Sequence, residues 1–172
     1  MQNPHPTLND ARARLNLVLS FFPRIDAKLS AILAIDTGML AAMAAKIPSA
    51  EVFSTWLGIA PAVAIALIAT SYWFLYRGAF PTLKGGESSL IYFREIAKRT
   101  EPRFVDEYQQ QTEEDLVKDV LNQTWRNSVI LSDKFRSLKI AFVNMAVAVL
   151  PWAVSVATFS ISGAQVHSKV LK

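Results

Sequence analysis

Ten polar and aromatic side chains that could hold a small anion lie in two short stretches, 88–94 and 123–134. A nucleotide needs an aromatic ring to stack on, amides to read the edge of its base, and a cation or helix N-terminus for its phosphate. The two stretches together supply these groups. In the second stretch, spacings of four and seven residues place Gln123, Asn127 and Lys134 on one side of a helix. The candidate ligand-binding residues are Ser89, Tyr92, Phe93, Arg94, Gln123, Asn127 and Lys134, with Ser88, Trp125 and Arg126 beside them.

A purely structural role explains the same residues. Tyr92 and Phe93 could pack two helices together with Ile96, and Lys134 could extend its aliphatic stem along the lipid surface while its ammonium stays in water. The residue types alone leave both interpretations open. What separates them is whether the side chains converge on one cavity.

Asp36 is the second candidate, because it lies near the middle of an apolar stretch. A charged side chain at the centre of a bilayer costs about 2.5–3.5 kcal/mol on insertion scales, so such residues usually face a partner or a water-filled space. We expect the small residues of this helix to pack within the protomer and Asp36 to face a neighbouring protomer or a pore. The alternative is a structural Asp36 that is hydrogen-bonded to Thr70, Ser71 or Tyr72. The small-residue stripe is Ala34, Gly38, Ala41, Ala42 and Ala45.

Enzyme chemistry has little support in the sequence. The two histidines, His5 and His167, lie near opposite ends of the chain, and the chain has no cysteine. Glycine-rich phosphate loops, His-x-x-His spacing and a Gly-x-Ser-x-Gly elbow are all missing from it. The acidic run 113–115 is better explained as a helix start, because three consecutive helical residues point in different directions. We therefore predict a protein without catalytic activity, cofactor or metal site. Binding to a nucleic acid polymer is also not expected, because no basic run alternates with aromatic residues.

Three apolar stretches, 29–47, 53–76 and 140–161, decide the class of protein. A helix needs about 20 predominantly apolar residues to cross the hydrocarbon core of a bilayer. Hydrophobic residues make up 52% of the 172 residues, and the mean hydropathy is +0.25. The sequence thus predicts an all-α membrane protein with three transmembrane helices.

Positive charges set the expected orientation. They concentrate before the first stretch, after the second and before the third, which places the N-terminus and the charged insert between the second and third stretches in the cytosol. The net charge of +4 fits contact with anionic lipid. The expected organisation is a cytosolic arm with an amphipathic helix at 1–28, spans at 29–47, 53–76 and 140–161, a ligand-sensing insert at 85–139, and a short tail at 162–172.

The arm and insert are expected to be helical. A helix over 9–22 would be capped by Asn9 or Asp10 and ended by Pro23. In the insert, a short helix would start at Ser88 or Ser89, and a second would start at Thr100. The acidic residues after Thr112 predict the start of a long helix that continues as the third span and bends near Pro151.

Three segments of the chain resemble the Pycsar transmembrane effectors, small bacterial membrane proteins of anti-phage defence. The first is Asp26-Ala27-Lys28, which opens the first span. The others are the run 89–97, SLIYFREIA, and the stretch from Gln123 through Asn127-Ser128 to Lys134-Phe135. These segments follow one another in the order and hydrophobic layout of the family.

The resemblance implies a multi-pass protein of the bacterial inner membrane that senses a cyclic pyrimidine mononucleotide, cyclic CMP or cyclic UMP. A partner cyclase would make this ligand, and the protein, as a homo-oligomer, would then disrupt the bilayer and cause abortive infection. Asp26, Lys28 and Asp36 would serve membrane contact or oligomer formation. Two alternatives remain: a ligand-free membrane scaffold or regulatory subunit, and an effector of a related cyclic-oligonucleotide system.

Overall fold

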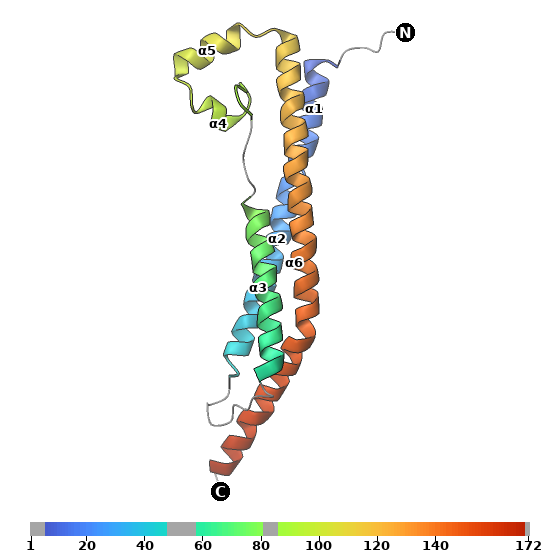
Figure 1. The fold of residues 1–172 in the computed structure, drawn as a ribbon, viewed down its shortest axis with the longest axis vertical. Helices are drawn as coiled ribbons and strands as arrows, with labels where there is room; N and C mark the ends of the chain where they lie inside the picture. Colours follow the sequence, from blue (N-terminus) through green and yellow to red (C-terminus); the bar gives the residue numbers. More distant parts are fainter. Residues whose placement is uncertain (1–5, 48–57, 81–85, 171–172) are drawn as a thin grey trace, which may run out of the picture. The chain divides into compact units, whose positions relative to one another are not determined.

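The computed structural model of the protein describes residues 6–47, 58–80 and 86–170, with the backbone alone for 163–170. Every regular element in these residues is a helix (Figure 1). Three helical stretches, Leu8–Ala44, Ile59–Ala79 and Glu113–Ser162, are long and apolar enough to cross a membrane. The predicted all-α membrane fold, with a helical segment between the second and third spans, is confirmed. The helices are α1 Leu8–Leu19, α2 Phe22–Ala44, α3 Ile59–Ala79, α4 Phe93–Ile96, α5 Glu101–Gln109 and α6 Glu113–Val170.

The predicted start and end of the first helix are wrong. Thr7 is the N-cap of α1, and its hydroxyl accepts the backbone N–H of Asp10 while the Asp10 carboxylate accepts the N–H of Thr7. Thr7 and Asp10 therefore form a capping box, with Asp10 at helix position N3. The helix ends at Leu19, and Pro23 lies in the first turn of α2, where its missing N–H costs no helical hydrogen bond.

In the insert, the predicted start at Ser88 or Ser89 is also wrong, because α4 begins only at Phe93. Ser88 has a φ of 65°, in the left-handed region, and the Ser89 hydroxyl accepts the backbone N–H groups of Ile91 and Tyr92. These contacts hold a turn in place of a helix. The other two predicted starts are confirmed, since Thr100 is the N-cap of α5 and α6 begins directly after Thr112.

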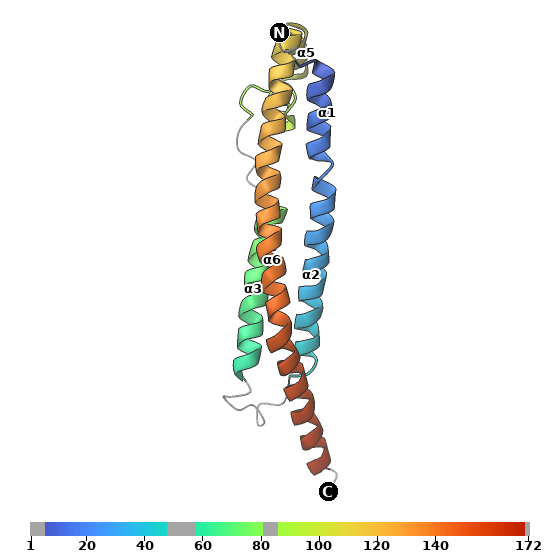
Figure 2. The same cartoon turned by 90° about the vertical axis from the view of Figure 1, so that its right-hand side faces the viewer.

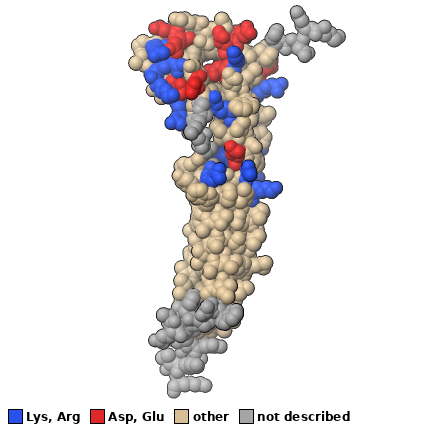
Figure 3. Space-filling model, viewed as in Figure 1, with Lys and Arg blue, Asp and Glu red and all other residues tan. Residues whose placement is uncertain are grey.

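The chain divides into two compact units. Unit 1 contains residues 1–25 and 81–134, and unit 2 contains residues 26–80 and 135–172. On the face drawn in Figure 3, charged side chains gather over unit 1, whereas the surface of the apolar helices is almost free of charge. Helix α6 is continuous and contributes residues to both units.

Unit 2 is a bundle of α2, α3 and the second part of α6 (Figure 2). A buried hydrophobic cluster within it contains one residue from each helix: Met39, Ile68 and Ala148. The Trp152 Nε1–H donates to the Met39 carbonyl at 2.8 Å, which adds a polar link between α6 and α2. At Gly78, a Cβ atom would lie 3.3 Å from both Leu29 and Ser137, so this glycine lets the three helices approach closely.

The helix bounds differ in detail from the expected spans. Helix α2 begins before residue 29 and ends at Ala44, while residues 53–57 of the expected second span lie outside the described residues. Helix α6 continues to Val170, through most of the expected tail. Pro151 lies inside α6, and the last part of this helix, drawn in red, bends away from the preceding part (Figure 1).

Candidate functional site

A polar pocket of about 290 Å³ lies within unit 1, between the turn that starts at Gly86 and one face of α6. This volume is at the lower limit of ligand pockets, which span about 300–1,000 Å³, so only a small molecule would fit. Its wall combines a cation, carboxylates, amides and an indole. The lining residues are Gly86, Glu87, Ser89, Asp119, Asn122, Gln123, Trp125 and Arg126.

Arg126 is the residue of this wall with unused binding capacity. Its Nη1 atom is buried and has no hydrogen-bond partner. A buried donor without an acceptor costs about 1–3 kcal/mol, and more when the group is charged. An anionic oxygen that reached this nitrogen would recover this energy. Trp125 precedes Arg126 and is 71% exposed, so its ring is available for stacking.

Ser89 fixes the turn against α6. Its hydroxyl donates to the Asp119 carboxylate at 2.9 Å and accepts the Gln123 side-chain amide at 3.1 Å. The same Asp119 oxygen accepts the backbone N–H of Leu90 at 2.9 Å. Since the hydroxyl also accepts backbone N–H groups of its own turn, its hydrogen-bonding capacity is used within the protein. Ser89 therefore shapes the pocket wall.

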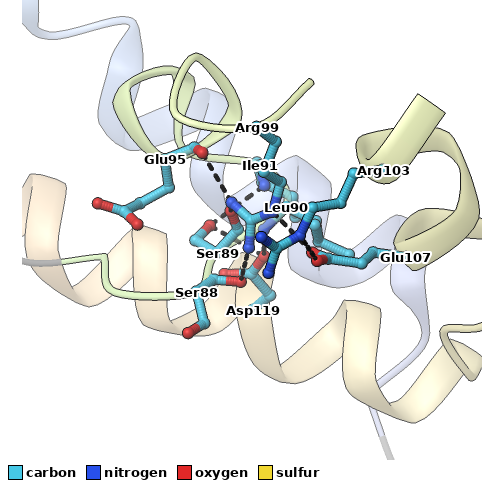
Figure 4. A network of polar contacts seen from close by, with 9 residues as sticks. All are labelled: Ser88, Ser89, Leu90, Ile91, Glu95, Arg99, Arg103, Glu107 and Asp119. Atoms are coloured by element: carbon cyan, nitrogen blue, oxygen red, sulfur yellow. Dashed lines mark hydrogen bonds and ion pairs between the residues drawn. The ribbon is translucent and has the colours of Figure 1, made fainter. Parts of the chain in front are cut away.

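Arg99 holds the other side of this turn (Figure 4). Its guanidinium donates to the carbonyls of Ser88 at 3.1 Å and Glu95 at 2.7 Å, and its Nε donates to the Glu107 carboxylate at 2.6 Å. Arg103 donates to the second oxygen of Glu107 at 2.7 Å. Hydrogen bonds from Arg103 and Arg99 hold the pKa of Glu107 below its usual value. One ion-pair network thus sets the backbone path of the turn that lines the pocket.

The structure brings some of the predicted ligand residues together. Ser89 and Gln123 line the pocket, and the Asn127 side-chain amide donates to the Gln123 carbonyl one helical turn further on. Tyr92 is half-buried and lies close to Gly86, where an added Cβ would meet its ring at 2.6 Å. Phe93 is exposed and stacks edge-on against Tyr92.

Arg94 and Lys134 do not line the pocket. Arg94 is exposed on α4. Lys134 is only 5% exposed, and its ammonium lies 5.7 Å from the centre of the Phe22 ring, a cation–π contact within unit 1. It follows Gln123 by eleven residues of helix, or about 16 Å. Arg126 is the cation that lines this pocket.

Four lining residues were not predicted: Gly86, Glu87, Asp119 and Asn122. The signal for part of this set was present in the sequence. Asp119, Asn122, Gln123 and Arg126 follow the i, i+3, i+4, i+7 spacing of one helix face. No spacing could have indicated that Gly86 and Glu87 meet this face, because they reach it through a turn about thirty residues earlier in the chain.

Asp36 lies at the centre of unit 2, and its side chain is 0% exposed. The Ser71 hydroxyl lies 2.6 Å from Asp36 Oδ2 and 3.2 Å from the Ala141 carbonyl oxygen, so the contacts join α2, α3 and α6. Asp36 Oδ1 has no hydrogen-bond partner. Ser71 was among the partners considered for a structural Asp36. Within the single chain, Asp36 therefore has the surroundings expected of a structural, hydrogen-bonded residue.

The expected division of the α2 faces is reversed. Ile32, Asp36, Met39 and Met43 are buried, whereas Ala34, Gly38, Ala41 and Ala45 of the small-residue stripe are exposed and Ala42 is half-buried. The reason is that lipid solvates apolar residues as well as a protein core does, so burial in a membrane bundle favours polar groups that find partners. Asp26 and Lys28 are exposed at the start of the span.

The fold and the pocket define a class: a helical membrane protein with three candidate spans and a polar cavity in its charged unit. The chain belongs to the Pycsar effector family, since the family model described as Pycsar effector protein domain matches residues 10–161, nearly the whole chain. It is thus a membrane effector of anti-phage defence rather than a member of a known enzyme family. No curated protein and no solved structure matches the chain significantly.

Proposed function

We propose that the pocket of unit 1 is a receptor site for a cyclic pyrimidine mononucleotide, cyclic CMP or cyclic UMP, made by a partner cyclase. The observation that carries the proposal is the buried Arg126 Nη1 without a hydrogen-bond partner at the wall of a small polar cavity. An anionic phosphodiester would supply the hydrogen-bond acceptor that this nitrogen lacks. Charge-assisted hydrogen bonds of this kind are about twice as strong as neutral ones.

The remaining lining residues suit the other parts of such a ligand. Trp125 offers a ring for the base, and the Asn122 side chain offers both a donor and an acceptor for the edge of a pyrimidine. A 3′,5′-cyclic nucleotide keeps one ribose hydroxyl, and Glu87 or Asp119 supplies a carboxylate that can accept it. Ser89, Gln123 and Arg99 position these groups, and the Tyr92 ring lies beside Gly86.

The effector step follows from the continuity of α6. Asn122 and Arg126 line the pocket, and Ala141 and Trp152 of the same helix hold polar contacts in the bundle of spans. A ligand shifts the bundle toward an open, membrane-disrupting assembly only if it binds that assembly more tightly than the closed one. We propose that this assembly is a homo-oligomer in the bacterial inner membrane and that its opening produces abortive infection.

Calorimetric titration of the full-length protein in detergent tests the receptor site. Cyclic CMP or cyclic UMP should bind, and cyclic AMP should bind less well. Arg126→Gln should weaken binding at least about tenfold, the loss of one charge-assisted hydrogen bond of ~1.5–3 kcal/mol. Arg12→Gln removes the same charge from an exposed position of α1 and should bind like the parent.

Two further variants separate the pocket from the residues that lie outside it. Arg94→Gln and Lys134→Gln should leave affinity within about twofold if the protein stays folded by circular dichroism. Normal binding by a folded Arg126→Gln protein would refute the site. Absence of binding for every cyclic mononucleotide would favour the scaffold alternative, and binding of a cyclic oligonucleotide instead would favour the related defence system.

A further inference from the structure

An apolar groove of about 500 Å³ lies between α2 and α6 within unit 2, and two lysines border it. Ala31, Ile35, Phe135 and Phe142 form much of its wall, together with the stems of Lys28 and Lys139. Phe142 is 54% exposed and Ile35 is 49% exposed, so the groove opens to the surroundings of the bundle. In a membrane, those surroundings are lipid.

Both lysines lie in the same half of the groove. Leu29 and Ser137 meet at Gly78. Lys28 comes one residue before Leu29 and Lys139 two residues after Ser137, so the two lysines lie within about one helical turn of each other along the bundle. Further along, Met39 and Ala148 share one core cluster, which shows that the two helices run in the same direction. Lys28 and Lys139 therefore lie in the same half of the groove, together with Phe135, and Ile35 and Phe142 lie deeper.

The charge pattern of the sequence puts the two lysines at the expected membrane boundary. Lys139 is the last charged residue before the uncharged run 140–161, and Lys28 is the last one before Asp36. Neither lysine takes part in an ion pair recorded among the described residues. From Lys28 to Ile35 the groove runs about 10 Å along α2, or a third of the ~30 Å hydrocarbon core.

We propose that this groove binds one anionic phospholipid, with the headgroup phosphate between Lys28 and Lys139 and an acyl chain along the apolar wall. The charge of the two lysines and the apolar wall below them match the two parts of such a lipid, and basic pockets between spans bind anionic headgroups in this way. The lipid would contact α2 and α6 together. The site is independent of the nucleotide pocket, so either proposal can fail without the other.

The test uses the full-length protein in nanodiscs of phosphatidylcholine with a small fraction of phosphatidylglycerol, and native mass spectrometry counts the lipids that stay bound. The parent should retain phosphatidylglycerol in preference to phosphatidylcholine. Each lysine near an anionic headgroup is worth about fivefold in affinity, so Lys28→Gln with Lys139→Gln should lower the preference ~25-fold.

Two controls make the site falsifiable. Arg77→Gln with Arg136→Gln removes the same two charges from exposed positions of unit 2 outside the groove, and the preference should fall less than twofold. Ala31→Trp fills the groove without changing the charge, and it should lower retention about as much as the lysine pair. Equal losses for the arginine and lysine pairs, or full retention by a folded Ala31→Trp protein, would overturn the proposal.

A soluble headgroup analogue distinguishes a lipid site from simple phosphate binding. Short-chain phosphatidylglycerol should raise the thermal midpoint of the detergent-solubilised parent protein, and glycerol 3-phosphate at the same concentration should not. Equal stabilisation by both would show that the lysines bind phosphate without the groove. That result would also contradict the proposed acyl-chain contact.

Discussion

The contacts of Ser71 predict how much the buried carboxyl contributes to the bundle. Ser71→Ala removes contacts of 2.6 Å to Asp36 and 3.2 Å to the Ala141 carbonyl. Because Asp36 Oδ1 already lacks a partner, both carboxyl oxygens would then be buried without one. An unsatisfied buried polar group costs about 1–3 kcal/mol, and hydrogen bonds between membrane helices average ~0.6 kcal/mol with a maximum near 1.7. We expect a loss of about 2 kcal/mol.

The assay is unfolding of the purified protein by SDS in mixed micelles, followed by circular dichroism. Thr70→Val is the matched control, since the Thr70 hydroxyl donates to the Ala66 carbonyl of its own helix and the side chain is exposed. Its loss should stay within about 0.5 kcal/mol. If Ser71→Ala unfolds at the same SDS fraction as the parent, the buried contacts do not hold the three helices together.

Substitutions of Asp36 then report where the proton of the short contact lies. A hydroxyl has one proton, so Ser71 can donate either to Asp36 or to the Ala141 carbonyl. A carboxyl that carries its own proton would satisfy both contacts, and an asparagine amide would do the same. Asp36→Asn should therefore keep most of the stability, while Asp36→Leu should lose about as much as Ser71→Ala. Equal losses in Asn and Leu variants would contradict the protonated carboxyl.

Two more predictions concern the turn at the pocket. Gly86 has a φ of 87°, and a Cβ there would collide with Arg126 Nη1 and the Tyr92 ring, so Gly86→Ala should weaken nucleotide binding more than tenfold in calorimetry while the helical content stays unchanged. The pKa of Glu107 is lowered in the folded protein, so its contribution to stability is present above the unfolded pKa of about 4.3 and is lost as the pH falls through the lower folded pKa. Thermal midpoints between pH 6 and pH 3 should fall less steeply for Glu107→Gln than for the parent, and parallel curves would contradict this.

The sequence by itself determined the class of protein and its helices, because these depend on local properties of the chain. Apolar length predicts the spans, and a hydroxyl followed by acidic residues predicts the start of α6 at Thr112. The three segments that resemble the Pycsar effectors also stand in the sequence alone, and the family match to residues 10–161 bears them out. Local signals were weaker at the arm, because Thr7, Asn9 and Asp10 lie close together and each of them can cap a helix.

Only the tertiary structure decided which side chains meet. The face of α2 that carries Asp36 turns inward, where Ser71, thirty-five residues further along the chain, offers Asp36 a partner. The pocket exists because Arg99 and Asp119 hold the turn at Ser88 and Ser89 against α6, and hydrogen bonds between residues this far apart leave no periodic trace in the sequence. For the same reason the sequence could not show that Arg126, rather than Lys134, lines the pocket. Both are cations on one helix, and only the packing of other elements against α6 distinguishes their positions.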